Sequence, residues 1–299
     1  MKQLITLFFS VVLIFSSSLE ASDNAGAFIE NGLSARAAAM GMSSVSSVKD
    51  SSALYWNSAV LATLANHDVQ VLGTQAYETN YLSIQSAFEA MGLTWGLGYI
   101  SASVDGVHET VESAIDNRYE RTGTELAYDA AAYYLATAYS ITEKLSLGVT
   151  AKYIQEKAAQ YQADAYGLDL GLLYTMNDRL TMGLNAQNVM SPELEWNTAS
   201  KNIDTIPLRV KTGASVSFLD KRLLSSFDVT MRDNRPSVLN AGVEYWLFNH
   251  LALRAGVDDS QLTCGTGLNF DFINFDFAWL KPNLDAIDDV YRFSLGYKF

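Results

Sequence analysis

The chain has 299 residues, a formal net charge of −13 at pH 7 and 18% charged residues, against roughly 25% in an ordinary soluble domain. Its 49% hydrophobic and 12% aromatic content excludes a disordered chain, which needs low hydrophobicity and high charge. The acidic balance argues against nucleic acid as a partner, because phosphate contacts need clustered Lys and Arg. The single cysteine, Cys264, excludes an intramolecular disulfide and a cysteine-based zinc site.

Residues 1–21 are predicted to be a secretory signal peptide. Lys2 precedes the short apolar run 4–15, and small residues lead to a cleavage site after Ala21. A buried helix is the alternative interpretation. The run is shorter than the about 20 apolar residues of a transmembrane helix, and no later stretch reaches that length. If the mature chain enters a membrane, it must therefore do so as a closed β-barrel.

The next segment, 22–66, shows no β alternation. Its stretch 35–41 is helix-forming and ends on Gly41, since Gly is a usual helix stop. From about residue 68 onward, by contrast, apolar residues recur with a period of two. In the last nine residues one face carries Tyr291, Phe293, Leu295, Tyr297 and Phe299, and the other carries Arg292, Ser294, Gly296 and Lys298.

Alternation over about nine residues indicates strands with one apolar and one polar face. About 9–11 residues is also the length that a tilted strand needs to cross a bilayer. We count fourteen such runs, at 68–75, 81–89, 93–101, 127–139, 145–155, 165–175, 180–188, 208–218, 223–231, 238–247, 251–258, 262–270, 273–280 and 291–299. An even number is typical of bacterial barrels. A soluble β fold also alternates and is the alternative.

The predicted connections differ in length with strand parity. Those after strands four, six, eight, ten and twelve are short, whereas those after strands three, five, seven and thirteen are long: 102–126, 156–164, 189–207 and 281–290. Outer-membrane barrels combine short periplasmic turns with longer outer loops. We therefore predict an all-β fold, a single transmembrane antiparallel barrel with both ends periplasmic. The acidic loop 102–126 is interpreted as a solvated surface, or else as a site for divalent cations or a basic partner.

The chain ends on Tyr297 and Phe299, which share a face. This ending resembles the terminal signal that the barrel insertion machinery reads, because a terminal edge strand can be captured by strand addition. The alternative is that the two residues only belong to a last strand.

Two N-terminal segments carry a more specific pattern. Residues 34–41 read SARAAAMG, and residues 50–62 read DSSALYWNSAVLA. Together they resemble the amino-terminal signature of the PorV/PorQ family of FadL-like outer-membrane barrels, SARAxAMGG followed by DDASALYWNPAGLA. The matching residues are Ser34, Ala35, Arg36, Gly41, Asp50, Tyr55, Trp56 and Asn57. The resemblance implies a fourteen-stranded barrel at 67–299 behind a plug or hatch at 22–66, which alternatively only fills space.

The segment also departs from that signature. Met42 stands at the second Gly, Ser58 replaces Pro and Val60 replaces Gly. Because Pro fixes φ and Gly permits positive φ, we expect the turn after Asn57 to be loosened or reshaped.

No phosphate loop, nucleophile elbow or HExxH motif occurs, and the three histidines are far apart in sequence. We predict a non-enzyme without a cofactor or metal site. The polar strand faces place charged residues of both signs in the lumen: Lys152, Asp169, Arg209, Lys211, Asp228, Glu244, Arg254, Asp276, Arg292 and Lys298. They are interpreted as ion pairs that fill the lumen, or else as the lining of a ligand passage.

The main functional hypothesis follows from the resemblance. PorV/PorQ proteins are associated with type IX secretion, which implies an accessory or carrier that contacts secreted proteins or secretion components at the outer membrane. The alternative is FadL-like uptake of long-chain fatty acids or other hydrophobic solutes through the barrel. A purely structural barrel in outer-membrane lipid is the third hypothesis.

Overall fold

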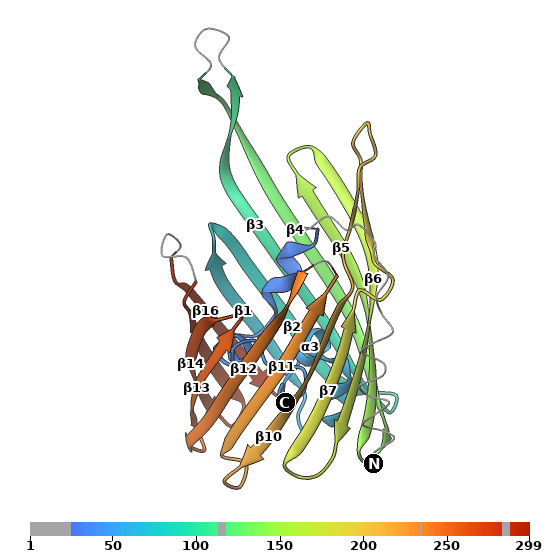
Figure 1. Cartoon of the computed structure of the whole chain (residues 1–299), viewed down its shortest axis with the longest axis vertical. Helices are drawn as coiled ribbons and strands as arrows, with labels where there is room; N and C mark the ends of the chain where they lie inside the picture. Colours follow the sequence, from blue (N-terminus) through green and yellow to red (C-terminus); the bar gives the residue numbers. More distant parts are fainter. Residues whose placement is uncertain (1–24, 113–117, 234, 283–287) are drawn as a thin grey trace.

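The computed structural model describes residues 25–112, 118–233, 235–282 and 288–299, most of which form one antiparallel β-barrel (Figure 1). Fourteen strands make the wall, and β1 pairs with β16 to close the cylinder. Closure satisfies the strand edges that an open sheet would leave unpaired. The prediction of a single fourteen-stranded barrel is confirmed, and the soluble-fold alternative is wrong.

The wall strands follow one another around the barrel in chain order: β1 (Asp68–Ala76), β2 (Thr79–Ala90), β3 (Leu93–Glu112), β4 (Tyr119–Thr142), β5 (Leu145–Ala158), β6 (Tyr161–Thr175), β7 (Leu180–Gln187), β10 (Arg209–Phe218), β11 (Leu223–Arg232), β12 (Arg235–Phe248), β13 (Leu251–Asp258), β14 (Gln261–Phe270), β15 (Ile273–Leu280) and β16 (Val290–Lys298).

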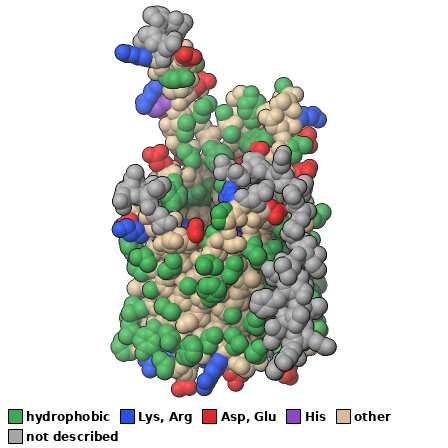
Figure 2. Space-filling view, in the orientation of Figure 1, with side chains coloured by type: hydrophobic (Ala, Val, Ile, Leu, Met, Phe, Trp, Pro, Cys, Tyr) green, Lys and Arg blue, Asp and Glu red, His purple; other side chains and the backbone are tan. Residues whose placement is uncertain are grey.

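The two faces of the wall differ in polarity. Exposed apolar side chains alternate with buried polar ones; in β16, Tyr291, Phe293 and Leu295 are exposed, whereas Arg292 and Ser294 are buried. Figure 2 shows hydrophobic side chains over the lower part of the wall, with charged groups at its bottom edge and above it. An apolar exterior around a polar interior is the arrangement of a transmembrane barrel. Among the described residues, no helix has the length and apolar content of a membrane span.

Two of the predicted long connections are largely strand. β3 and β4 run on through most of 102–126 and rise above the rest of the rim (Figure 1). β5 and β6 likewise extend to Ala158 and Tyr161, so the predicted loop 156–164 is a two-residue turn. Above the lipid both faces of a strand meet water, so apolar alternation stops while backbone pairing continues. The apolar periodicity therefore underestimated the lengths of these four strands.

The connection 189–207 also contains regular structure. β8 (Glu193–Trp196) and β9 (Ile203–Thr205) form a short hairpin, and β8 adds to the upper part of β6. The parity argument holds in part: the connections after β2, β4, β6, β10, β12 and β14 are short, but those after β1, β5, β11 and β13 are short as well.

A row of tyrosines crosses the outer face of the barrel at one level. Tyr99, Tyr133, Tyr153 and Tyr166 are cross-strand neighbours on β3 to β6, with successive ring centroids 5.2, 6.0 and 5.1 Å apart. Aromatic rows of this kind lie at the membrane–water interface of barrels.

Candidate functional site

The N-terminal segment lies inside the barrel. It contains η1 (Ala27–Asn31), α2 (Ala35–Ala39), α3 (Ala53–Trp56) and η2 (Ser58–Thr63), and Figure 1 shows it enclosed by the wall strands. We call the described part of this segment, 25–66, the plug. Helices of four to six residues are unstable on their own, so the plug owes its conformation to the wall around it. The predicted signal peptide, 1–21, lies outside the described residues.

The first half of the signature sequence places a charge against the wall. Ser34 caps α2 by accepting a hydrogen bond from the Ala37 N–H at 3.3 Å, and Ala35 is fully buried. Arg36 then faces β12, where its Nε and Nη2 bind the two oxygens of Glu244 at 2.8 and 2.9 Å. This two-point geometry fixes both distance and orientation.

Glu244 joins the plug to a chain of charges in the wall. It also accepts from Arg254 Nε at 2.7 Å, and Arg254 Nη1 lies 2.7 Å from Asp276. All four side chains are buried. A buried charge is tolerated only when it is paired, so the plug arginine and the wall charges depend on one another.

Gly41 allows the chain to turn against the wall. Its φ is +61°, and a Cβ there would lie 2.3 Å from the Val257 carbonyl oxygen. Only glycine combines this conformation with so close an approach. Met42, which replaces the second glycine of the signature, adopts a φ of +59°.

The second half of the signature holds the plug in place through hydrogen bonds and aromatic packing. Asp50 accepts a hydrogen bond from the Ser52 N–H at 3.0 Å. Tyr55 donates to the Ile29 carbonyl at 2.8 Å and accepts from Arg209 at 3.2 Å. Burial raises the pKa of Tyr55, so the neutral phenol makes both bonds. The Trp56 ring packs edge-on against that of Tyr55. Lys211 Nζ lies over the Trp56 ring, 5.1 Å from the ring centroid.

Asn57 holds the turn that the sequence departures were expected to disturb. Its amide donates to the carbonyls of Val45 and Leu172 at 2.8 and 3.0 Å and caps η2 by accepting from the Ala59 N–H. η2 is a regular 3-10 helix, and Val60 does not have a positive φ. The turn is therefore ordered without Pro or Gly, because side-chain bonds from Asn57 replace their conformational bias.

The other charged side chains predicted for the lumen also point inward. Lys152 pairs with Asp169 at 2.7 Å, and Lys211 lies 3.8 Å from Asp228 and donates to the Met42 carbonyl. Lys298 is partly buried and donates to Asn269 at 3.0 Å. Arg209 and Arg292, in contrast, bind neutral oxygens of the plug, those of Tyr55 and Asn31. Whether these residues also line a passage stays a prediction.

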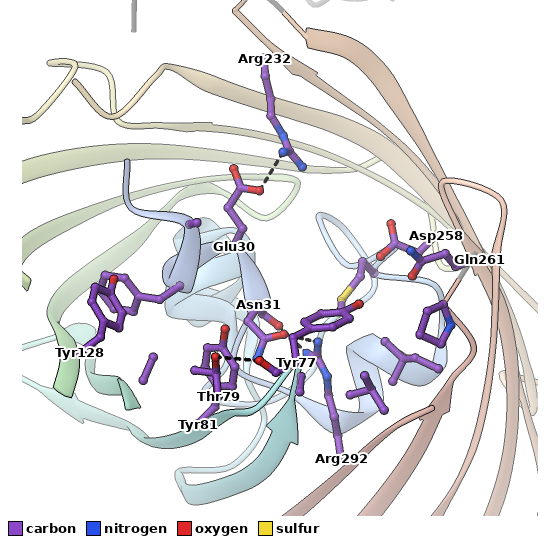
Figure 3. A pocket seen from close by; sticks show the side chains of 18 residues that line it. Glu30, Asn31, Tyr77, Thr79, Tyr81, Tyr128, Arg232, Asp258, Gln261 and Arg292 are labelled. Carbon is purple, nitrogen blue, oxygen red and sulfur yellow. Dashed lines mark hydrogen bonds and ion pairs between the residues drawn. The ribbon is translucent and has the colours of Figure 1, made fainter. Parts of the chain in front are cut away.

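A cavity of about 450 Å³ lies above the plug at the barrel mouth (Figure 3). Its floor is η1, and its sides come from β1, β2, β3, β4, β11, β13, β14, β15 and β16. The polar side chains labelled in Figure 3 converge on it from η1, the β1–β2 turn and several strands: Glu30, Asn31, Tyr77, Thr79, Tyr81, Tyr128, Arg232, Asp258, Gln261 and Arg292. Cavities of this size hold small molecules.

Solved structures share this architecture. The toluene transporter TbuX of Ralstonia pickettii superposes with a TM-score of 0.68 at 14% identity, over 90% of this chain and 98% of that chain. TodX, the P. putida toluene transporter, gives 0.67 at 13% identity, over 90% and 99%. A FadL homologue of Pseudomonas aeruginosa gives 0.60 at 12% identity, over 89% and 98%. This chain has the FadL-type fold. No family model and no curated protein matches its sequence.

In this FadL-type barrel the C-terminal residues face outward. Tyr297 and Phe299 are exposed, and the Phe299 N–H donates to the His67 carbonyl at 3.0 Å, next to the start of β1. Their proposed role in insertion stays a prediction. Among the described residues, no group of three or more His, Cys, Asp and Glu side chains is placed to hold a metal ion.

Several residues of the cavity above the plug were not predicted. Glu30 and Asn31 precede the signature, and Asp258 ends a predicted strand. Arg232 lies one residue beyond a predicted run. No sequence pattern brings them together, because their proximity depends on where the plug crosses the lumen.

Proposed function

We propose that this protein is an outer-membrane channel for small hydrophobic solutes, in which the plug moves to let them pass. The observation that carries the proposal is the placement of a solute-sized cavity directly above an N-terminal plug, in a barrel that shares its fold with solved toluene transporters. That likeness favours the solute hypothesis over the protein-secretion hypothesis that followed from the PorV/PorQ resemblance.

We infer that the cavity faces the cell exterior. The C-terminal residue, Phe299, lies at the barrel end where all six connections between neighbouring strands are short, and short turns are periplasmic in outer-membrane barrels. The cavity and the β3–β4 hairpin lie at the opposite end (Figure 1). A solute from outside would meet the cavity first and the plug second.

Passage requires the plug to leave its seat, because its central part is almost completely buried. Its contacts with the wall combine apolar packing with hydrogen bonds. Gln85 donates to the Leu33 carbonyl, Thr150 to that of Leu54, and Asn240 to that of Gly41. Each such bond contributes only about 0.5–1.5 kcal/mol, since water can replace it. The hydrogen-bonded part of the contact is therefore compatible with release of the plug when water enters.

A disulfide between plug and wall would test this motion. Ser43 of the plug and Ser226 of β11 have hydroxyl oxygens 2.6 Å apart, close to the about 2.05 Å of a disulfide. In a Cys264→Ser background, we expect oxidised Ser43→Cys/Ser226→Cys protein to lose uptake of radiolabelled toluene into proteoliposomes. Reduction with dithiothreitol should restore it.

The control links two wall strands instead. Ser140 and Ser146 have hydroxyl oxygens 3.0 Å apart on β4 and β5, so Ser140→Cys/Ser146→Cys adds a disulfide without tethering the plug. Uptake by this variant should not change on oxidation. Equal uptake by the oxidised plug-tethered variant would exclude plug motion, and absence of protein-dependent uptake in the wild type would exclude the channel itself.

A further inference from the structure

One group of strands lines cavities at both ends of the barrel. β1, β15 and β16 all contribute to the cavity above the plug, where Figure 3 labels Arg292 of β16. At the opposite end, the same three strands contribute Gln70, Asn274 and Lys298 to a second cavity of about 100 Å³, at the base of the plug. The inward side chains between these two cavities therefore decide whether the cavities communicate.

These inward side chains are mostly polar and follow the strand register. At the upper of two levels, Leu72 of β1 stands between Ser83 of β2 and Ser294 of β16. At the lower level, Gln70 of β1 pairs with Gln85 of β2. Since inward residues alternate with lipid-facing ones along a strand, the two levels follow each other directly down the lumen.

Four polar side chains at these levels each have an atom without a hydrogen-bond partner. Ser83 Oγ, Gln85 Oε1, Asn274 Oδ1 and Ser294 Oγ bond to none of the residues that the structure describes. All four residues are buried, with relative exposures of 0, 1, 9 and 2%. Folded proteins leave few buried polar atoms unpaired, and ordered water satisfies those that have no protein partner. We call the whole group the polar seam: Gln70, Leu72, Ser83, Gln85, Asn274 and Ser294.

The plug lies less tightly against the wall along this seam. On β5, β6, β7, β12 and β13 an inward glycine brings the wall so close that an added Cβ would lie 2.3 Å from a plug atom. On β16, by contrast, the inward Gly296 meets the side chain of Asn274. The seam contacts the plug through a side-chain end, the Gln85 amide, which donates to the Leu33 carbonyl at 2.8 Å. Contact through side-chain ends has room for water that close backbone contact lacks.

We propose that the polar seam conducts water past the seated plug, as a file of water molecules that joins the two cavities. This activity goes beyond the proposed solute channel, because it needs no movement of the plug. Apolar solutes are excluded from the seam, since they would leave its polar atoms unpaired. Ions are excluded as well, because its few neutral oxygens cannot replace an ion's hydration shell.

Water permeability can be measured separately from toluene uptake. Stopped-flow light scattering follows the shrinkage of proteoliposomes after an osmotic step. We expect vesicles that contain the wild-type protein to shrink faster than protein-free vesicles. In the Cys264→Ser background, oxidised Ser43→Cys/Ser226→Cys protein should keep this water permeability although its plug is tethered and toluene uptake is lost.

Substitutions in the seam assign the water path. Ser83→Val/Ser294→Val removes both hydroxyls and adds apolar bulk, so it should reduce shrinkage to the rate of protein-free vesicles while toluene uptake persists. Ser83→Ala and Ser294→Ala add no bulk, and each should lower water permeability in part. The matched control is Ser146→Val, since Ser146 is a buried serine of β5 whose hydroxyl pairs with that of Ser140. It should leave water permeability unchanged. Heat-modifiable mobility in gel electrophoresis verifies that each barrel is folded.

The outcomes separate this inference from the channel function. Wild-type vesicles that shrink no faster than protein-free ones overturn the water path. So does water permeability that falls with toluene uptake when the plug is tethered, because water would then pass only through the opened lumen. Unchanged permeability in folded Ser83→Val/Ser294→Val overturns the assignment to the seam. Water permeability without any toluene uptake supports the seam and excludes the solute channel alone.

Discussion

Glu244 is the single carboxylate that two guanidinium groups share, one from the plug and one from the wall. Glu244→Gln would leave Arg36 and Arg254 buried without their common counter-ion. Breaking a buried ion pair in this way costs about 3–5 kcal/mol. We therefore expect the plug to leave its seat more often, seen as a higher open probability in planar-bilayer recordings and a lower unfolding temperature.

The same substitution at an exposed pair provides the control for Glu244. Glu195 lies 3.7 Å from Lys201, with side chains 61% and 77% exposed, and exposed pairs contribute less than about 1 kcal/mol. Glu195→Gln should match the wild type in both measurements. Closed channels and an unchanged unfolding temperature in Glu244→Gln would contradict the assigned role of the shared carboxylate.

At this scale the sequence identified residues but not their partners. Arg36 was singled out by its motif and Glu244 by its position on a polar strand face, yet the two lie 208 positions apart. Periodicity reports which face of a strand a residue occupies and carries no information on which plug residue meets it. Asn31 and Arg292 illustrate the same limit, since their contact is set by the path of the plug.

The β3–β4 hairpin extends well beyond the lipid-facing wall. From the tyrosine row at Tyr99, β3 continues to Glu112, and its upper residues are mostly exposed. A two-stranded ribbon in water adds little stability. We expect replacement of residues 105–127 by Asn-Gly, which joins the paired residues Val104 and Tyr128, to leave barrel stability and toluene uptake within error of the wild type.

This replacement also discriminates between the two functional hypotheses. A carrier for secreted proteins would use its projecting outer surface for contact, whereas a solute channel would not need it. An Asn-Gly turn suits a two-residue hairpin connection, so the remaining strands should keep their pairing. Loss of uptake in a variant that still migrates as a folded barrel would contradict the solute-channel interpretation of this element.

The strands were predictable where one side meets lipid and the other the polar lumen. There, alternation located all fourteen wall strands to within a few residues, as β13 and β15 illustrate, with predicted bounds equal to those observed. Alternation of apolar and polar residues did not locate the upper parts of β3 and β4, above the lipid. Both faces of these strands meet water there, so the alternation disappears. It also missed β8 and β9, which are too short for a period to emerge.

The shape of the whole lumen follows the plug. On five wall strands an inward glycine brings the wall against the plug, such that a Cβ at each would lie 2.3 Å from a plug atom: Gly148, Gly171, Gly183, Gly242 and Gly256. The wall and the plug thus fit each other over much of the circumference, and side chains at these positions would exclude the plug. Closure of the lumen is in this sense a property of the complete molecule.

Replacing a single one of these glycines by a larger residue should therefore open the lumen. In Gly183→Val the new Cβ would approach the Val45 carbonyl oxygen at 2.3 Å, which backbone atoms cannot accommodate without shifting the plug. Gly73→Val is the matched control, since a Cβ there meets nothing within 4 Å on the outer face. We expect Gly183→Val to conduct ions in planar bilayers while Gly73→Val stays closed. If both variants stay closed, the wall can relax around the added side chain, and the fit between plug and wall is not what seals the lumen.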